Sequence, residues 1–265
     1  MSWVSVHAFY HGELDALVTD GLRPLVDELA ARSLIDGFFF LRYWDGGPHL
    51  RVRLSATAEE PVRDLALRRL RGYLAANPSK DRLDRYAERS AWLAAAEGVG
   101  DYLRTPMPNN TVHEIPYRPE TERYGHGAAM STVECHFVES SRIALGLLAA
   151  RPTESQRQTA AFGAIALALS GRRPRPPEPD AELEARYLDT RSRLRALATH
   201  LAEISSGTST LPATGALSAW WRTVSTLPDP RVADLCAHLF CNRLGVGIGQ
   251  ERFLRYAALR TLTGE

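Results

Sequence analysis

The segment from Phe38 to Leu54 constrains the fold more than any other part of the chain. It reads FFFLRYW, then DGGP, and then HLRVRL, in which polar and apolar residues alternate without a break. Two strand-like runs joined by a glycine-containing turn are typical of a β-hairpin. We therefore expect two antiparallel strands, over residues 38–44 and 48–54.

Alternation along a strand gives the second strand two different faces, because successive side chains point to opposite sides. One face carries His49, Arg51 and Arg53, and the other carries the leucines and the valine between them. A four-residue turn would pair Trp44 with His49 and would place Arg42 opposite Arg51. Like charges that face each other destabilise a sheet. Such a face therefore needs either acidic partners within an ordinary solvated surface or an anionic ligand, and the segment alone favours neither.

The remaining pattern indicates an α+β fold with a small antiparallel or mixed sheet. Strands are expected over 3–10 and 110–117, and a helix interrupted near Pro24 is expected over 13–32. Further helices are expected over 59–76, 128–150, 154–169, 180–204, 213–226, 230–244 and 248–262, with a Pro/Arg-rich loop near 171–180. Because the strands come early and the helices late, we predict one domain over 1–265, strand-rich over 1–126 and helical over 127–265.

Composition excludes several classes of protein. The chain has 265 residues, 45% hydrophobic and 24% charged, which rules out intrinsic disorder, and its net charge of +1 argues against general nucleic-acid binding. Of 32 basic residues only Lys80 is lysine. This bias follows either from GC-rich coding or, at a few positions, from a need for bidentate contacts to carboxylates. The chain has no signal-peptide pattern and no apolar stretch of ~18 residues, so we expect no membrane span. Its three cysteines are an odd number without a disulfide framework, which fits a cytoplasmic protein.

Two later segments also carry polar groups in suggestive places. The first, YRPETERYGHG over 117–127, combines a possible Glu120–Arg123 pair with two glycines that flank His126 before a helix. The second, HLFCNRL over 238–244, puts His238, Cys241 and Asn242 on one helical face. Each can be an ordinary structural element, a capped helix entry or a buried histidine, as readily as a site. The spacing of Cys236, His238 and Cys241 does not suit a structural zinc, so no metal is expected.

Taken together and in this order, the three segments resemble the thiopeptide-type bacteriocin biosynthesis domain. This is the same module as the C-terminal glutamate-elimination domain of class I lanthipeptide dehydratases, here as a stand-alone chain. The resemblance runs from Trp3 to the last helix, and GGPHLRVRL is its most specific part. Where many relatives read Arg-Tyr-Gly-Gly, this chain inserts His126, so the role of that residue in the loop is open.

The resemblance implies a lyase that acts on a ribosomally made precursor peptide with a leader and a core. A large partner would transfer glutamate from glutamyl-tRNA to Ser or Thr, and this chain would expel it to form dehydroalanine or dehydrobutyrine. The resemblance also implies that the catalytic residues are Arg51, Arg53, Arg123 and His238. Neighbouring residues are expected to bind the substrate: Arg42, His49, Glu120, Tyr124, His126, Asn242 and Arg243. No cofactor and no direct nucleic-acid or membrane contact is expected. Two alternatives remain, a pyridine-forming [4+2] enzyme of thiopeptide biosynthesis and a non-catalytic subunit that binds the precursor.

Overall fold

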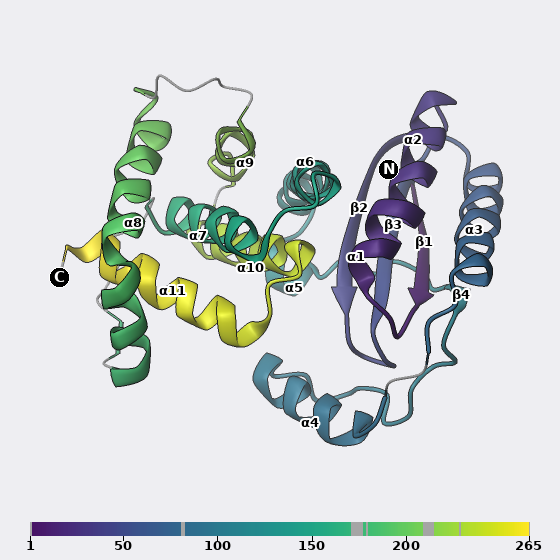
Figure 1. The fold of residues 1–265 in the computed structure, drawn as a ribbon. Coiled ribbons are helices and arrows are strands. Elements are labelled where there is room, and N and C mark those ends of the chain that lie inside the picture. The colour runs from purple at the N-terminus through teal and green to yellow at the C-terminus, as the bar shows by residue number, and fades with distance from the viewer. Residues whose placement is uncertain are drawn as a thin grey trace. The chain divides into compact units, whose positions relative to one another are not determined.

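The computed structural model describes residues 2–80, 83–170, 177–178, 180–208, 215–227 and 229–264. The chain forms two compact units, Met1–Arg118 and Pro119–Glu265 (Figure 1). The N-terminal unit contains the sheet and the C-terminal unit is helical, which confirms the α+β class. Most of the predicted Pro/Arg-rich loop, residues 171–176 and 179, lies outside the described residues. The boundary between the units, after Arg118, lies eight residues before the predicted boundary between the strand-rich and the helical part at 126. The prediction of a single domain stays a prediction.

The sheet of the N-terminal unit has four antiparallel strands in the order β2-β3-β1-β4. The strands are β1 (Ser2–Phe9), β2 (Ile35–Tyr43), β3 (His49–Ala56) and β4 (Thr111–Glu114). One face is mostly apolar, and its buried apolar members include Val4, Val6, Phe38, Phe40, Leu50, Val52 and Leu54. Each of these side chains contributes roughly 1.5–3 kcal/mol when it is removed from water. This face therefore holds the core of the unit.

Helices that precede and follow the hairpin pack against the sheet. They are α1 (Leu14–Ala16), the π-helical turn η1 (Leu17–Leu22), α2 (Arg23–Ala31) and α3 (Glu59–Ala76), of which α2 packs on β2 and α3 on β1. The helical backbone is continuous from Leu14 to Ala31, so the predicted interruption near Pro24 is instead a change from π-helical to α-helical turns between Leu22 and Arg23. Proline has no N–H to donate, and the wider π-helical turn lies directly before it.

The hairpin loop is one residue longer than predicted, and this changes the pairing of the strands. Tyr43, not Trp44, lies opposite His49, so Arg42 lies opposite Leu50. The prediction that Arg42 faces Arg51 is therefore wrong. Arg42 lies on the other face, where its guanidinium forms a 2.6 Å ion pair with Asp15.

Contacts from a distant segment hold this loop in place. The N–H of Gly46 donates to the hydroxyl of Tyr86 over 2.8 Å, and the same hydroxyl donates to the carbonyl of Leu103 over 2.7 Å. Gly47 has a φ of +100°, which favours glycine, and a Cβ there would lie 2.8 Å from the ring of His11. Tyr86 begins helix α4 (Tyr86–Glu97), which the sequence analysis missed because its buried positions are Tyr86, Ser90 and Ala94 and give little apolar signal.

The C-terminal unit is built around one buried helix, α7 (Glu154–Ser170), in which every residue from Ala161 to Leu169 is buried. Four helices pack on it: α8 (Ala181–Ser206), α9 (Ala216–Val224), α10 (Pro230–Leu244) and α11 (Ile248–Thr263). Two further helices, α5 (Thr121–Tyr124) and α6 (Ala128–Ala149), begin the unit. The carboxylate of Asp229 caps α10 by accepting the N–H of Arg231 over 2.7 Å, and Pro230 occupies the first turn, where a missing N–H is tolerated.

Candidate active site

The second face of the sheet is polar and aromatic. The pairing of β1, β2 and β3 places His49, Arg51 and Arg53 beside side chains of the two neighbouring strands. Those neighbours are Ser5, His7 and Phe9 of β1 and Phe39, Leu41 and Tyr43 of β2. None of these strand positions is acidic. We name this group of side chains the cationic face.

His49 orients Arg51 on the cationic face. The ring is buried, its Nδ1–H faces the carbonyl of Gly47 over 2.9 Å, and its Nε2 accepts the Nε–H of Arg51 over 3.2 Å. Burial lowers the pKa of His49 to about 3, and the charges of Arg51 and Arg53 add to this effect. A neutral ring is what this arrangement needs, because a second N–H would point at the N–H of Arg51. The guanidinium of Arg51 also stacks on the ring of Tyr43, 3.3 Å from its centroid.

Arg53 and His7 extend the cationic face. Arg53 is 8% exposed and its guanidinium lies 5.6 Å from the ring centroid of Tyr117. Burial, and then the charge of Arg53, lowers the pKa of His7 to about 2. The imidazoles are therefore neutral at pH 7, and the charge of the face comes from its two arginines. His7 was not among the predicted site residues. The alternation of β1, with Ser5, His7 and Phe9 on one face and Val4, Val6 and Ala8 on the other, could have placed it on the cationic face.

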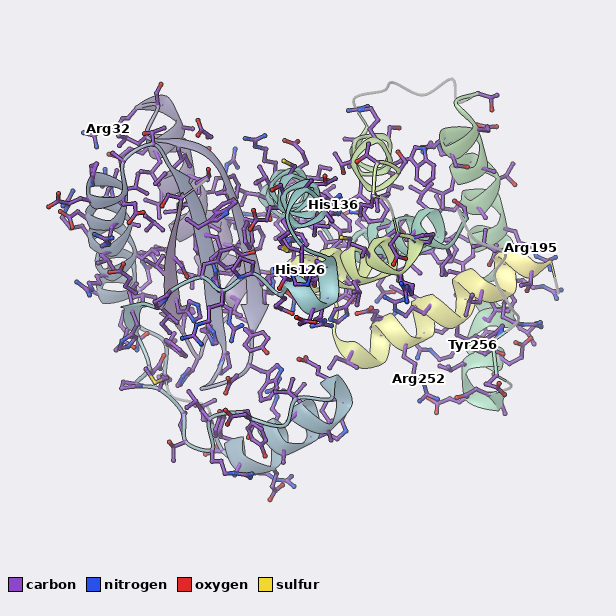
Figure 2. All side chains as sticks on the ribbon, turned by 180° about the vertical axis from the view of Figure 1, so that it is seen from behind. Arg32, His126, His136, Arg195, Arg252 and Tyr256 are labelled. Atoms are coloured by element: carbon purple, nitrogen blue, oxygen red, sulfur yellow. The ribbon has the colours of Figure 1, made fainter. Side chains whose placement is uncertain are left out.

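The segment that opens the C-terminal unit forms the predicted ion pair. Arg123 and Glu120 lie 3.1 Å apart, and both side chains are exposed. Tyr124 is buried edge-on against Phe137 with ring centroids 5.3 Å apart, so it anchors α5 to α6. His126 is exposed just before α6, 4.0 Å from Glu122 (Figure 2).

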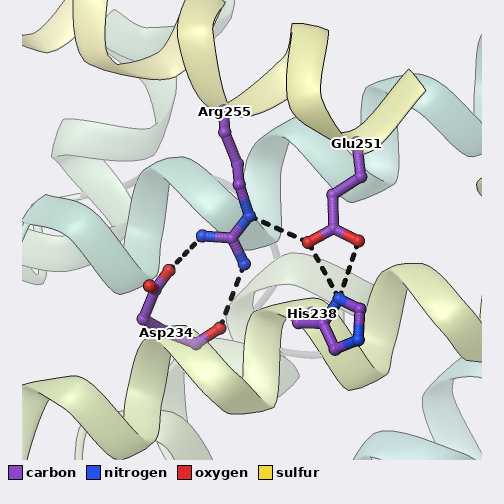
Figure 3. Close-up of polar contacts among 4 residues, drawn as sticks. All are labelled: Asp234, His238, Glu251 and Arg255. Carbon is purple, nitrogen blue, oxygen red and sulfur yellow. Dashed lines mark hydrogen bonds and ion pairs between the residues drawn. The ribbon is translucent and has the colours of Figure 1, made fainter. Parts of the chain in front are cut away.

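His238 lies on α10 and forms a polar cluster with residues of α11 (Figure 3). Its Nδ1 lies 2.8 and 3.1 Å from the two carboxylate oxygens of Glu251. The Nε–H of Arg255 donates to Glu251 over 2.8 Å, and the same guanidinium pairs with the carboxylate of Asp234. The ring of His238 is 35% exposed, whereas the carboxylate of Glu251 is only 7% exposed. His238 was predicted as a site residue, whereas its partner Glu251, and Arg255 and Asp234 beyond it, were not.

Arg243 is fully buried. Its guanidinium donates to the hydroxyl of Ser140 over 3.2 Å and lies 5.6 Å from the ring centroid of Phe137. Burial lowers its pKa to about 10. These are the contacts of a residue that joins α10 to α6, and its predicted role in substrate binding stays a prediction. Asn242 beside it is half-buried.

A second histidine, His136 on α6 (Figure 2), is also deeply buried in the C-terminal unit. Its Nδ1 lies 2.9 Å from the hydroxyl of Thr223, and its ring meets the edge of Trp220. Burial, and then the charge of Arg243, lowers its pKa to about 3. This histidine is a core residue, and the residues around it explain its neutral state.

The structure thus groups the predicted site residues by unit. The N-terminal unit brings together His49, Arg51 and Arg53 and separates Arg42 from them, and the C-terminal unit carries Arg123 and His238. Within the described ranges, no three His, Cys, Asp or Glu side chains are arranged to hold a metal ion. Nor does any described helix combine the length and the apolar character needed to cross a membrane.

One family model matches nearly the whole chain. The sequence profile described as lantibiotic biosynthesis dehydratase C-term matches residues 3–262. A solved structure described as "Pyridine synthase, TbtD, from thiomuracin biosynthesis" is 20% identical, with a TM-score of 0.77 over 100% of this chain and 98% of that one. TsrL is 18% identical, with a TM-score of 0.67 over 100% of this chain and 95% of that one.

A third solved structure is much longer than this chain. It is the tRNA-dependent lantibiotic dehydratase MibB from Microbispora sp. 107891, at 21% identity and a TM-score of 0.61. The match covers 97% of this chain but only 27% of MibB. At these identities the three structures establish a shared fold. Comparison with curated protein sequences gives no significant match.

Proposed function

The chain belongs to the lantibiotic biosynthesis dehydratase C-terminal family, and we propose that it eliminates glutamate from glutamylated Ser or Thr residues of a precursor peptide. The family places it among enzymes of lanthipeptide and thiopeptide biosynthesis. The finer assignment rests on one observation. Two arginines lie side by side on a sheet face whose histidines are neutral, and this suits a substrate with two carboxyl groups.

The proposed reaction is a β-elimination that needs no redox step. A base takes the α-proton of the modified residue, and the electrons of that C–H bond form the Cα=Cβ double bond. The Cβ–O bond breaks, and its electrons leave with glutamate as a carboxylate. Negative charge therefore grows on the leaving group in the transition state, while the glutamyl unit keeps a second, free carboxylate.

Arg51 and Arg53 are the proposed donors to the glutamyl unit. The guanidinium fork binds a carboxylate through two parallel N–H groups. Arg51 is already oriented by His49 and Tyr43, so little ordering remains when the substrate binds. A well-placed donor to a developing oxyanion is worth about 2.7–4 kcal/mol. The resemblance assigns a catalytic role to Arg123 as well, which is exposed on α5, and this role stays a prediction.

His238 is the proposed base. Its Nδ1 faces the carboxylate of Glu251, which can only accept a hydrogen bond, so in the neutral ring the lone pair lies on Nε2. The ring is partly exposed, which a peptide substrate requires. A positioned general base contributes about 10²–10⁴-fold to a rate.

Replacement of His238 tests this assignment. With the glutamylating partner and a precursor peptide present, His238→Ala should accumulate glutamylated peptide, detected by mass spectrometry. His200→Ala is the matched control, because His200 also pairs with a glutamate, Glu203 at 3.3 Å, and its side chain is 32% exposed. Normal dehydration by His238→Ala would refute the role of His238 as base.

A second candidate function is pyridine formation by joining two dehydroalanines, followed by loss of water and the leader peptide. The observation that favours it is the similarity to the pyridine synthase TbtD, which extends over nearly the whole of both chains. A peptide that already carries two dehydroalanines separates the two reactions. A loss of mass equal to water and leader would establish the cyclase, whereas glutamate release from a glutamylated peptide would establish the eliminase.

A further inference from the structure

We infer that Glu251 is the positioning residue of His238, and that Arg255 and Asp234 hold Glu251 in place so that Nε2 of His238 is the proton-transfer atom. The inference rests on the proposed function only for the reaction in which His238 takes part. The arrangement of the four side chains does not depend on it. Neither Glu251 nor its two supporting residues belongs to the three segments that carry the resemblance to the family.

The four side chains form two matched pairs on neighbouring helices (Figure 3). Asp234 and His238 are one turn apart on α10, and Glu251 and Arg255 are one turn apart on α11. Contacts run from Asp234 to Arg255 and from His238 to Glu251. The two helices therefore present facing turns, and each turn supplies one acid and one base.

The chemistry of a carboxylate fixes the state of the imidazole. An ionised carboxylate only accepts hydrogen bonds, so the Nδ1 of His238 must donate and must carry a proton. In a neutral ring this leaves the lone pair on Nε2. The contact to both oxygens of Glu251, at 2.8 and 3.1 Å, also limits rotation of the ring. The same orientation of a histidine by a carboxylate operates in the Ser-His-Asp triad.

Arg255 keeps Glu251 ionised and in place. Burial alone would raise the pKa of Glu251, but the hydrogen bond that it accepts from His238 and the contact with the guanidinium of Arg255 outweigh burial and lower the pKa. The guanidinium reaches both sides of the cluster. Its Nε–H donates to Glu251 over 2.8 Å, while its other nitrogens contact the carboxylate of Asp234 and, over 3.3 Å, the carbonyl of Asp234. Lysine has no planar fork and cannot make this set of contacts.

A purely structural role would make a different prediction. A Glu251–Arg255–Asp234 cluster that served only to join α10 and α11 would not depend on which nitrogen of His238 carries the proton. A positioning role requires that the tautomer change when the carboxylate is replaced. Glutamine at position 251 can either donate to or accept from Nδ1, so both tautomers would become accessible.

The test measures the tautomer and the rate together. Protein labelled with ¹⁵N-histidine gives the protonation state of each nitrogen of His238 by long-range ¹H–¹⁵N NMR. The wild-type ring should carry its proton on Nδ1, and Glu251→Gln should give a mixture of tautomers. The kcat for glutamate release should fall at least about tenfold, but less than on loss of the base. KM should change less than kcat.

Glu184→Gln is the matched control. Glu184 also joins two helices, α8 and α11, through Arg260 at 2.9 Å and the hydroxyl of Tyr256 at 2.6 Å. This variant should keep the Nδ1–H tautomer. Arg255→Lys serves as a second variant that keeps the charge, and it should show the same shift in tautomer as Glu251→Gln, to a smaller degree.

Two results would overturn the inference. One is a wild-type His238 that carries its proton on Nε2. The other is a Glu251→Gln variant that keeps both its tautomer and its kcat, or that loses activity with the tautomer unchanged, which would assign Glu251 a structural role. If the wild-type protein releases no glutamate, the proposed function fails. The NMR measurement still decides the arrangement, and the rate is then measured with the peptide that carries two dehydroalanines.

Discussion

Mild acid should destabilise the N-terminal unit through its buried histidines. His7 and His49 stack with ring centroids 5.1 Å apart, and their pKa values are lowered to about 2 and about 3. The unfolded chain takes up a proton at each ring near pH 6.5, whereas the folded unit does not. Stability is therefore complete above pH 6.5 and is lost as the pH falls below it.

The size of this loss follows from the unfolded pKa. Between pH 7.0 and 5.5, each buried neutral histidine costs about 1.2 kcal/mol of unfolding free energy, as long as its folded pKa lies below about 4.5. The two rings together should cost the N-terminal unit about 2.5 kcal/mol, and His136, whose pKa is lowered to about 3, should cost the C-terminal unit as much as one of these rings. Ordinary carboxylates stay ionised in this interval, since their pKa values lie near 4, so the histidines dominate the change.

Urea unfolding at the two pH values measures the effect. His7→Leu should reduce the difference between pH 7.0 and 5.5 by about 1.2 kcal/mol, because it removes one of the titrating groups. Val6→Ala, at the adjacent buried position of β1, is the control and should lower stability equally at both pH values. A wild-type difference below about 0.5 kcal/mol, or one that His7→Leu leaves unchanged, would refute the reasoning.

Two further predictions concern the proposed site. Arg51→Lys keeps the charge but loses the fork and the stacking on Tyr43, so kcat for glutamate release should fall about 10²–10³-fold in a mass-spectrometric assay. Arg63→Lys is the control, because Arg63 pairs with Glu114 at the surface, and its kcat should stay near that of the wild type. Equal rates for the two variants would show that Arg51 has no special role in the reaction. Asp229→Ala removes the N-cap of α10 and should cost about 0.5–2 kcal/mol in thermal unfolding. An unchanged Tm would show that this cap is not needed to hold the helix.

Much of the fold could be predicted from local sequence because the signals are local. The prediction of α3 is confirmed in both bounds, and those of α6, α7 and α10 to within a residue, since apolar spacing and Asp-Pro or glycine at the ends define these helices. The pairing within the hairpin could not be predicted. A loop of four and a loop of five residues are equally compatible with DGGP, and the length is fixed by Tyr86, which binds Gly46 from forty residues away.

The candidate site, too, could be predicted from the sequence only in part. His49, Arg51 and Arg53 alternate along one strand, so their common face could be predicted from the sequence. The partner of His238 could not, because Glu251 and the Arg255 that binds it lie on another helix, and nothing in the local sequence pairs Glu251 with α10. Arg243 illustrates the opposite case. It reads as a polar site residue in the sequence, whereas the structure buries it between two helices.

The alternation of β1 and β3 has a consequence for how such a protein can change over time. Every second residue of these strands belongs to the core beneath the helices, and the residues between them belong to the cationic face. Substitutions at the second set do not change the side chains that pack beneath α2 and α3, so the charge of the cationic face can change while the apolar face of the sheet is kept. An insertion or deletion of one residue within either strand would instead exchange the two sets. This chain can therefore acquire new chemistry through point substitutions but not through changes in strand length.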